Sequence, residues 1–175
     1  MNILEIILIF AITKKNNFMS DKSVILKEVE CGENAALYSI KFSSESETEF
    51  EKFISKFKDN AVYNEHYNSI IFALKHIMEV GAFERYFRNE GGDIKALGLD
   101  SKNLRLYCLR LSDSILIIGN GGVKTTRTYQ ESEELNGYVM NLKAFNKMLK
   151  SALKKDEISI KGLSITGIES KEFDL

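Results

Sequence analysis

Two apolar runs separated by a short polar segment constrain the fold of this chain more than any other feature. Residues 104–111 and 115–118 are rich in large apolar side chains, as buried strands are. Ser112, Asp113 and Ser114 lie between them and have the short polar side chains that favour a tight connection. We therefore expect two consecutive strands that pair antiparallel in one sheet.

The first half of the chain predicts a hairpin followed by two helices. Residues 24–30 and 36–42 alternate imperfectly between apolar and polar side chains, which indicates a β-hairpin. Ser44 and Glu47 have the spacing of a capping box, and the apolar residues after them follow the i, i+3, i+4, i+7 pattern of a helix. A second helix follows directly, and Gly81 is placed to end it.

The second half predicts a meander, a third helix and a β-type tail. A strand at residues 94–99 precedes the two strands described above, so three mainly antiparallel strands are expected in sequence. A helix with one apolar stripe is expected from about residue 131 to 154, and residues 158–168 add one more strand or hairpin. The helices are grouped rather than placed after every strand, which is typical of the α+β class.

The length of 175 residues is that of one domain with its own core. Proline, Gly/Ser-rich linkers and internal repeats are absent after Met19, so residues 19–175 are interpreted as a single domain. Residues 1–18 are interpreted as an extension or arm, with an extra edge strand or short helix as the alternative. The apolar run at residues 3–12 contains Glu5 and spans about half of the ~20 residues that a membrane helix needs. No membrane association is expected.

Charge is spread unevenly along the chain. The formal net charge of −1 gives no overall attraction to nucleic acid, so any such binding requires a local patch. The acidic group consists of Glu45, Glu47, Glu49 and Glu51, and the basic group consists of Lys143, Lys147, Lys150, Lys154 and Lys155. We expect one acidic and one basic face. Four of these lysines, Lys143, Lys147, Lys150 and Lys154, share one side of the third helix, which suits contact with an RNA backbone, an acidic partner or a solvated surface.

Cysteine and histidine usage argues against a metal centre. Cys31 and Cys108 form no C-x-x-C pair, which indicates reduced thiols in a cytoplasmic protein. His66 and His76 stand too far apart in the second helix for a tight metal site. The sequence therefore predicts no metal and no cofactor.

The glycine-rich segment at residues 119–126, GNGGVKTT, invites comparison with a phosphate-binding loop. Val123 stands where that motif has glycine before its lysine, and no βαβ unit surrounds the segment. Nucleotide hydrolysis is therefore the weaker interpretation. Asn120 and Gly121 are instead expected to form a turn.

Basic and phenolic side chains mark the strands around this segment. Alternation places Arg105 and Tyr107 on one face of the sheet and Arg110 on the other. Arg110 ends its strand, where a guanidinium can reach a bound phosphate. The following segment contributes Lys124, Arg127 and Tyr129. We predict a cationic rim that binds an RNA backbone, with a phenol that stacks on a base.

The order of elements and the run GGDIKALGLDSKNLRLYCLRLSDSILIIGNGGVKTTRTYQ resemble the RelE/HigB-like toxin superfamily of bacterial toxin-antitoxin systems. The resemblance covers about residues 36–154. It implies a helical hairpin packed on a small, mainly antiparallel sheet, here with an N-terminal β-hairpin and a C-terminal helix and strand. It also implies a cytoplasmic toxin whose partners are a cognate antitoxin, mRNA and the ribosome.

Active members of this superfamily cleave mRNA, usually on the ribosome, by helping a ribose 2′-OH attack the adjacent phosphate. This chemistry needs a proton acceptor, a proton donor and cations. The residues interpreted as catalytic are Arg110, Lys124, Arg127 and Tyr129. The residues interpreted as RNA-binding are Lys95, Arg105, Tyr107, Lys143, Lys147 and Lys150. The alternative is a protein of the same fold that binds a protein partner without catalysis.

Overall fold

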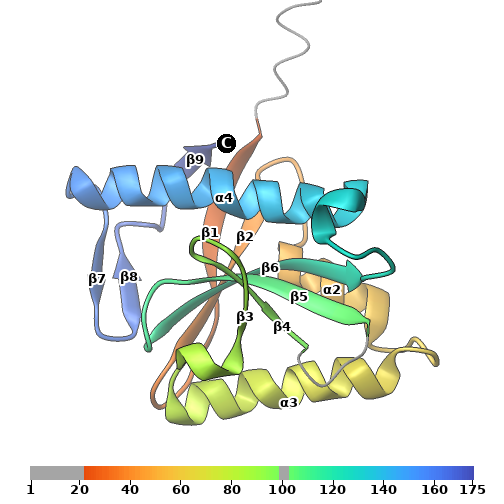
Figure 1. Cartoon of the computed structure of the whole chain (residues 1–175). Helices are drawn as coiled ribbons and strands as arrows, with labels where there is room; N and C mark the ends of the chain where they lie inside the picture. The colour runs from red at the N-terminus through yellow and green to blue at the C-terminus, as the bar shows by residue number, and fades with distance from the viewer. Residues whose placement is uncertain (1–21, 99–102) are drawn as a thin grey trace, which may run out of the picture.

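The computed structural model describes residues 22–98 and 103–175, which form a mixed sheet with helices on both faces (Figure 1). The elements of this part are, in chain order, β1 (Ser23–Cys31), β2 (Ala36–Phe42), α2 (Glu49–Phe57), α3 (Asn64–Val80), β3 (Arg88–Gly91), β4 (Ile94–Leu97), β5 (Leu104–Arg110), β6 (Ile115–Val123), α4 (Glu133–Lys154), β7 (Ser159–Lys161), β8 (Ser164–Thr166) and β9 (Glu172–Asp174). The expected α+β class is confirmed.

The main sheet has seven strands in the order β3-β4-β5-β6-β2-β1-β9. Strands β3 to β6 form an antiparallel meander, and β1 pairs antiparallel with β2 and β9. The two halves are joined by a parallel pair, β2 and β6, in which Ala36 lies beside Ile115. A parallel pair needs a long connection, which the two helices and the meander provide. The sheet is larger and more mixed than the small antiparallel sheet that was expected.

Apolar side chains cover both faces of the sheet. Helices α2 and α3 pack on one face, where Phe53 and Ile77 are fully buried against strand residues such as Leu116. Helix α4 packs on the opposite face, where Phe145 and Leu149 are fully buried. Figure 1 shows α3 and α4 on opposite sides of the strands. Side chains of β5 and β6 therefore face either the α2–α3 side or the α4 side.

Local capping explains where the helices begin and end. Helix α2 begins after Thr48, whose hydroxyl accepts a hydrogen bond from the Glu51 N–H at 3.1 Å. The Glu51 carboxylate accepts one from the Thr48 N–H at 2.6 Å, which completes a capping box. The start expected at Ser44 and Glu47 is thus four residues too early. Gly81 ends α3 with φ = 112°, as the sequence predicted.

Strand β6 continues through the glycine-rich segment, so the turn expected at Asn120 and Gly121 is wrong. Gly121 pairs with Leu106 and Ile118 pairs with Cys108, which leaves one extra residue on β6 and makes a β-bulge. A Cβ atom on Gly121 would lie 2.0 Å from the carbonyl oxygen of Arg105. The glycine is required by this close approach of two backbones rather than by a turn.

The tail forms the β7–β8 hairpin and then β9, which joins the edge of the main sheet beside β1. The hairpin agrees with the alternation expected in residues 158–168. Within residues 22–98 and 103–175 no helix is long and apolar enough to cross a membrane. The interpretation of residues 1–18 falls outside the described residues, and the single domain over 19–175 stays a prediction.

Candidate functional site

Two of the expected RNA-contacting cations meet at one carboxylate on the α3 side of the sheet. Arg110 donates from Nε to the carbonyl oxygen of Ala82 at 2.5 Å, contacts Asp113, and places Nη1 3.4 Å from Glu84 Oε2. Lys95 places Nζ 2.5 Å from Glu84 Oε1. The hydrogen bond from Lys95 lowers the pKa of Glu84 below its usual value. Both cations are therefore already engaged by protein groups.

The other two strand residues face α4, as their alternation predicted. Arg105 is buried and donates from Nη1 to the carbonyl oxygens of Gly98 at 2.7 Å and Leu104 at 2.9 Å. Tyr107 is 0% exposed, and its ring centroid lies 6.1 Å from that of Tyr129. Burial raises the pKa of Tyr107 far above the usual range of a phenol. Burial thus disfavours the phenolate form of Tyr107.

Tyr129 and Lys143 come together from two segments that are separate in the sequence. Lys143 donates from Nζ to the Tyr129 hydroxyl at 3.1 Å, and the same ammonium lies 5.7 Å from the ring centroid. Tyr129 is buried, whereas Lys143 is exposed on α4. Lys124 and Arg127 lie on the connection between β6 and this tyrosine, with Lys124 half-buried and Arg127 exposed. Lys143 thus contacts the phenol of Tyr129, and Lys124 and Arg127 precede that tyrosine on the same connection.

Sequence reasoning missed a carboxylate on the same face. Glu90 lies in β3 with a side chain that is largely buried, and its Oε1 is 3.7 Å from Nε of Arg88. That oxygen accepts no hydrogen bond from any residue in the described part of the chain. The charge of Glu90 raises the pKa of Tyr107 and the charge of Arg105 lowers it, both after the larger effect of burial, so the three groups are neighbours. Strand β3 has no apolar alternation, and only the Gly91-Gly92 turn after it signals a hairpin.

We call this group the α4-face cluster and define it as Arg88, Glu90, Arg105, Tyr107, Tyr129 and Lys143. It combines a carboxylate, three cations and two phenols between strands β3 to β5 and helix α4. Four of its members were expected from the sequence, and the structure brings them together from three elements. Lys95 and Arg110 are not part of it, because they face the α3 side.

Part of the lysine stripe of α4 contacts other protein groups and part of it is exposed. Lys150 contacts Asp93 in the β3–β4 turn, and Asn146 donates to the same carboxylate oxygen at 2.9 Å. The hydrogen bond from Lys150, followed by that from Asn146, lowers the pKa of Asp93. These contacts link α4 to the β3–β4 turn. Lys143 and Lys147 remain exposed on the helix surface.

The Tyr107 hydroxyl supports a prediction about stability. It is buried and accepts or donates no hydrogen bond among the described residues. Tyr107→Phe removes a buried hydroxyl that has no protein partner, so we expect the free energy of unfolding to stay unchanged or to rise by about 1 kcal/mol. Urea unfolding of both proteins measures the change. A loss of stability would show that the hydroxyl forms a bond important to the fold.

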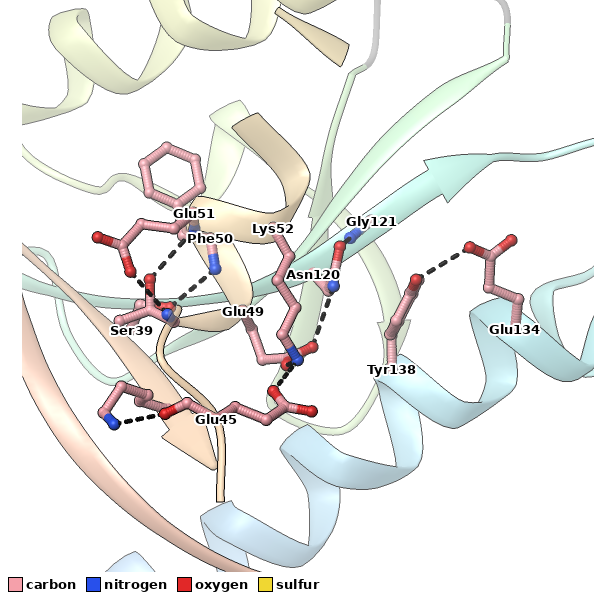
Figure 2. Close-up of polar contacts among 12 residues, drawn as sticks. Ser39, Glu45, Glu49, Phe50, Glu51, Lys52, Asn120, Gly121, Glu134 and Tyr138 are labelled. Atoms are coloured by element: carbon pink, nitrogen blue, oxygen red, sulfur yellow. Dashed lines mark hydrogen bonds and ion pairs between the residues drawn. The ribbon is translucent and has the colours of Figure 1, made fainter. Parts of the chain in front are cut away.

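A second buried carboxylate, which the sequence analysis assigned to an acidic face, joins α2 to β6 (Figure 2). Glu49 is 3% exposed and accepts hydrogen bonds from Asn120 Nδ2 at 3.1 Å and from Lys52 Nζ at 2.6 Å. Lys52 also contacts Glu45, and Asn120 Oδ1 accepts a hydrogen bond from the Gly121 N–H at 2.8 Å. The bulge of β6 aims Asn120 at the start of α2. Because these polar groups form hydrogen bonds with one another, we interpret the cluster as a structural link between α2 and β6.

This arrangement removes Glu49 from the acidic face that was expected from residues 45–51, whereas Glu45, Glu47 and Glu51 are exposed. Glu49 is buried, and Lys52 lies between Glu45 and Glu49 and offsets their charges. The signal that could have identified the cluster is Asn120, a polar amide between glycines at the end of an apolar strand. Among the described residues, no group of three or more His, Cys, Asp or Glu side chains could hold a metal ion.

No protein-family model, curated protein or solved structure matches this chain. The functional argument therefore depends on the chemistry of the α4-face cluster and on the order of the elements.

Proposed function

We propose that this protein is the toxin of a toxin-antitoxin pair, with a RelE-like variant of the α+β fold, and that it cleaves mRNA on the ribosome. The α4-face cluster is the observation that carries the proposal. Cleavage by the neighbouring 2′-OH needs an acceptor for its proton, a donor for the leaving oxygen and cations at the phosphate. The cluster contains residues suited to each of these tasks.

In this proposal Glu90 accepts the proton of the ribose 2′-OH. Its Oε1 is buried and accepts no hydrogen bond from the described residues, so in this proposal RNA binding exposes an acceptor that has no competing donor. Arg88 and Arg105 stabilise the charge that develops on the phosphate, and the burial of Arg105 strengthens that interaction. The bond from the 2′-oxygen to phosphorus forms while the bond to the 5′-oxygen breaks.

The leaving 5′-oxygen takes a proton from Lys143, whose ammonium the Tyr129 hydroxyl holds in place at 3.1 Å. In this proposal Lys124, Arg127 and Lys147 contact phosphates on either side of the scissile bond. Such contacts position an RNA strand without reading its sequence and make binding weaker at high salt. In this proposal the exposed cations supply affinity and the α4-face cluster supplies chemistry.

The test is induced expression in a bacterium that lacks the cognate antitoxin. We expect growth arrest and new mRNA ends of one kind, a 2′,3′-cyclic phosphate upstream of each cut and a 5′-hydroxyl downstream, because the 2′-OH is the nucleophile. Mapping both ends of the fragments measures this. Normal growth and intact mRNA at a high level of soluble protein would contradict the proposal.

The second candidate is a protein-interaction module of the same fold without catalysis. The specific observation that favours it is the state of three expected catalytic or binding residues: Arg110 is engaged by Ala82 and Glu84, and both Tyr107 and Tyr129 are buried. This candidate predicts soluble, harmless expression and co-purification of one protein partner. The fragment ends described above distinguish the two candidates.

A further inference from the structure

Helix α3 has a second stripe of residues on the side that faces away from the sheet. Tyr67, Ile70, Leu74, Ile77 and Met78 are the buried side of the helix. The outer stripe consists of Val62, Glu65, Ser69, Phe72 and His76, which are spaced alternately by three and four residues. This is the spacing of the contact seam in a two-stranded coiled coil. These residues therefore lie along one line on the outer side of the helix.

The outer stripe exposes more apolar surface than a solvated helix requires. Phe72 is 73% exposed and Val62, just before the helix, is 75% exposed. Beside Phe72 lies an open, shallow surface formed by α3 itself, which includes Ser69, Ala73 and His76. Small side chains at two of these positions leave room for a large side chain that packs from outside.

The stripe is complementary to itself. In an antiparallel pair of identical helices related by a two-fold axis, the same contact occurs twice with the partners exchanged. If the axis crosses the outer side of the helix at the height midway between Ile70 and Ile71, Phe72 of one copy lies opposite Ser69 of the other. The same axis places Glu65 opposite His76. One register thus satisfies both an apolar and a polar contact.

The polar contact is supported by the surroundings of His76. The Tyr86 hydroxyl accepts a hydrogen bond from Arg85 Nη2 at 3.2 Å and lies 3.3 Å from His76 Nε2, so the Nε2 side of the imidazole ring faces Tyr86. The other ring nitrogen, Nδ1, can donate in the tautomer that carries its proton there. Glu65 is exposed on α3, and its carboxylate is an acceptor. The two ends of the stripe therefore carry a matching donor and acceptor.

We propose that two copies of this chain associate through α3, with the helices antiparallel and each Phe72 inserted beside Ser69 and Ala73 of the other copy. The interface lies on the opposite side of the sheet from the α4-face cluster, so the dimer contact covers neither cluster. The proposal goes beyond the proposed function and does not depend on it.

Sedimentation velocity over a wide range of protein concentrations, with reductant to keep the exposed Cys31 from cross-linking, tests the proposal. The wild type is expected to shift with concentration from 19.9 kDa toward twice that mass. Phe72→Glu is expected to weaken association by at least about 30-fold, as loss of an interface hot spot does. Met140→Glu, which changes an exposed apolar residue of α4, is the matched control and is expected to leave association unchanged.

A charge exchange tests the register. His76→Glu places two carboxylates opposite each other at both ends of the seam and is expected to favour the monomer. Adding Glu65→Lys to that variant restores opposite charges and is expected to restore the dimer. A monomeric wild type at every concentration, or a dimer that Phe72→Glu does not affect, would overturn the proposal. A double variant that stays monomeric while remaining folded by circular dichroism would overturn the antiparallel register.

Discussion

Glu90→Gln is expected to lower the rate of RNA cleavage by about 100-fold or more, because an amide cannot accept the proton that a carboxylate accepts. The substitution keeps the shape of the side chain, so the packing around it is retained. The side chain has no hydrogen bond to Oε1 that the amide would break. The effect is therefore expected on the chemical step and not on folding.

The measurement is single-turnover cleavage of an mRNA on ribosomes by purified wild type and variant. Glu30→Gln, an exposed residue of β1, is the matched control and is expected to cleave at the wild-type rate. The thermal midpoints of all three proteins are expected to agree closely. If Glu90→Gln cleaves as fast as the wild type, Glu90 is not the base. If the wild type itself does not cleave, the interaction module is the better interpretation.

Gly121→Ala is expected to lower the free energy of unfolding by about 3 kcal/mol, the upper part of the range for inserting a methyl group into a packed site. The added Cβ would lie 2.0 Å from the carbonyl oxygen of Arg105 and 2.9 Å from Cα of Leu106. Both obstacles are backbone atoms of β5, which cannot rotate away as a side chain can. The bulge must open, and the pairing of β5 with β6 is disturbed at the centre of the sheet.

Gly137→Ala is the matched control, because the same change is made in a helix with nothing within 4 Å of the new Cβ. There alanine is expected to raise the free energy of unfolding by roughly 0.5–1 kcal/mol, since glycine is a poor residue for a helix interior. Urea unfolding of the two variants should thus give changes of opposite sign. Similar stability of both variants would show that β6 can shift away from β5 at little cost.

Much of the fold could be predicted from local patterns in the sequence. Alternation along β5 placed Arg105 and Tyr107 on one face and Arg110 on the other, and the structure confirms this division. The stripe of α3 and its end at Gly81 were also predicted correctly. These features depend on residues a few positions apart, so they can be read without knowing what packs against them.

The candidate site was harder to predict. Arg105, Tyr107, Tyr129 and Lys143 were expected to contact RNA or take part in catalysis, and they do lie on one face of the sheet. The sequence did not indicate Glu90, because a charged four-residue edge strand has no apolar pattern. Nor did it indicate that Lys95 and Arg110 share Glu84, a contact among three separate elements.

The sequence by itself determined the identity and order of the main elements, the faces on which the side chains of β5 lie and the α+β class, because side-chain periodicity is a property of the local backbone. Only the tertiary structure decided the parallel pairing of β2 with β6, the bulge at Asn120 and the burial of Glu49. Each of these depends on contacts between residues far apart in the chain. The glycines of β6 show the difference most directly: their composition suggests a turn, but the close approach of β5 and α4 makes them part of a strand.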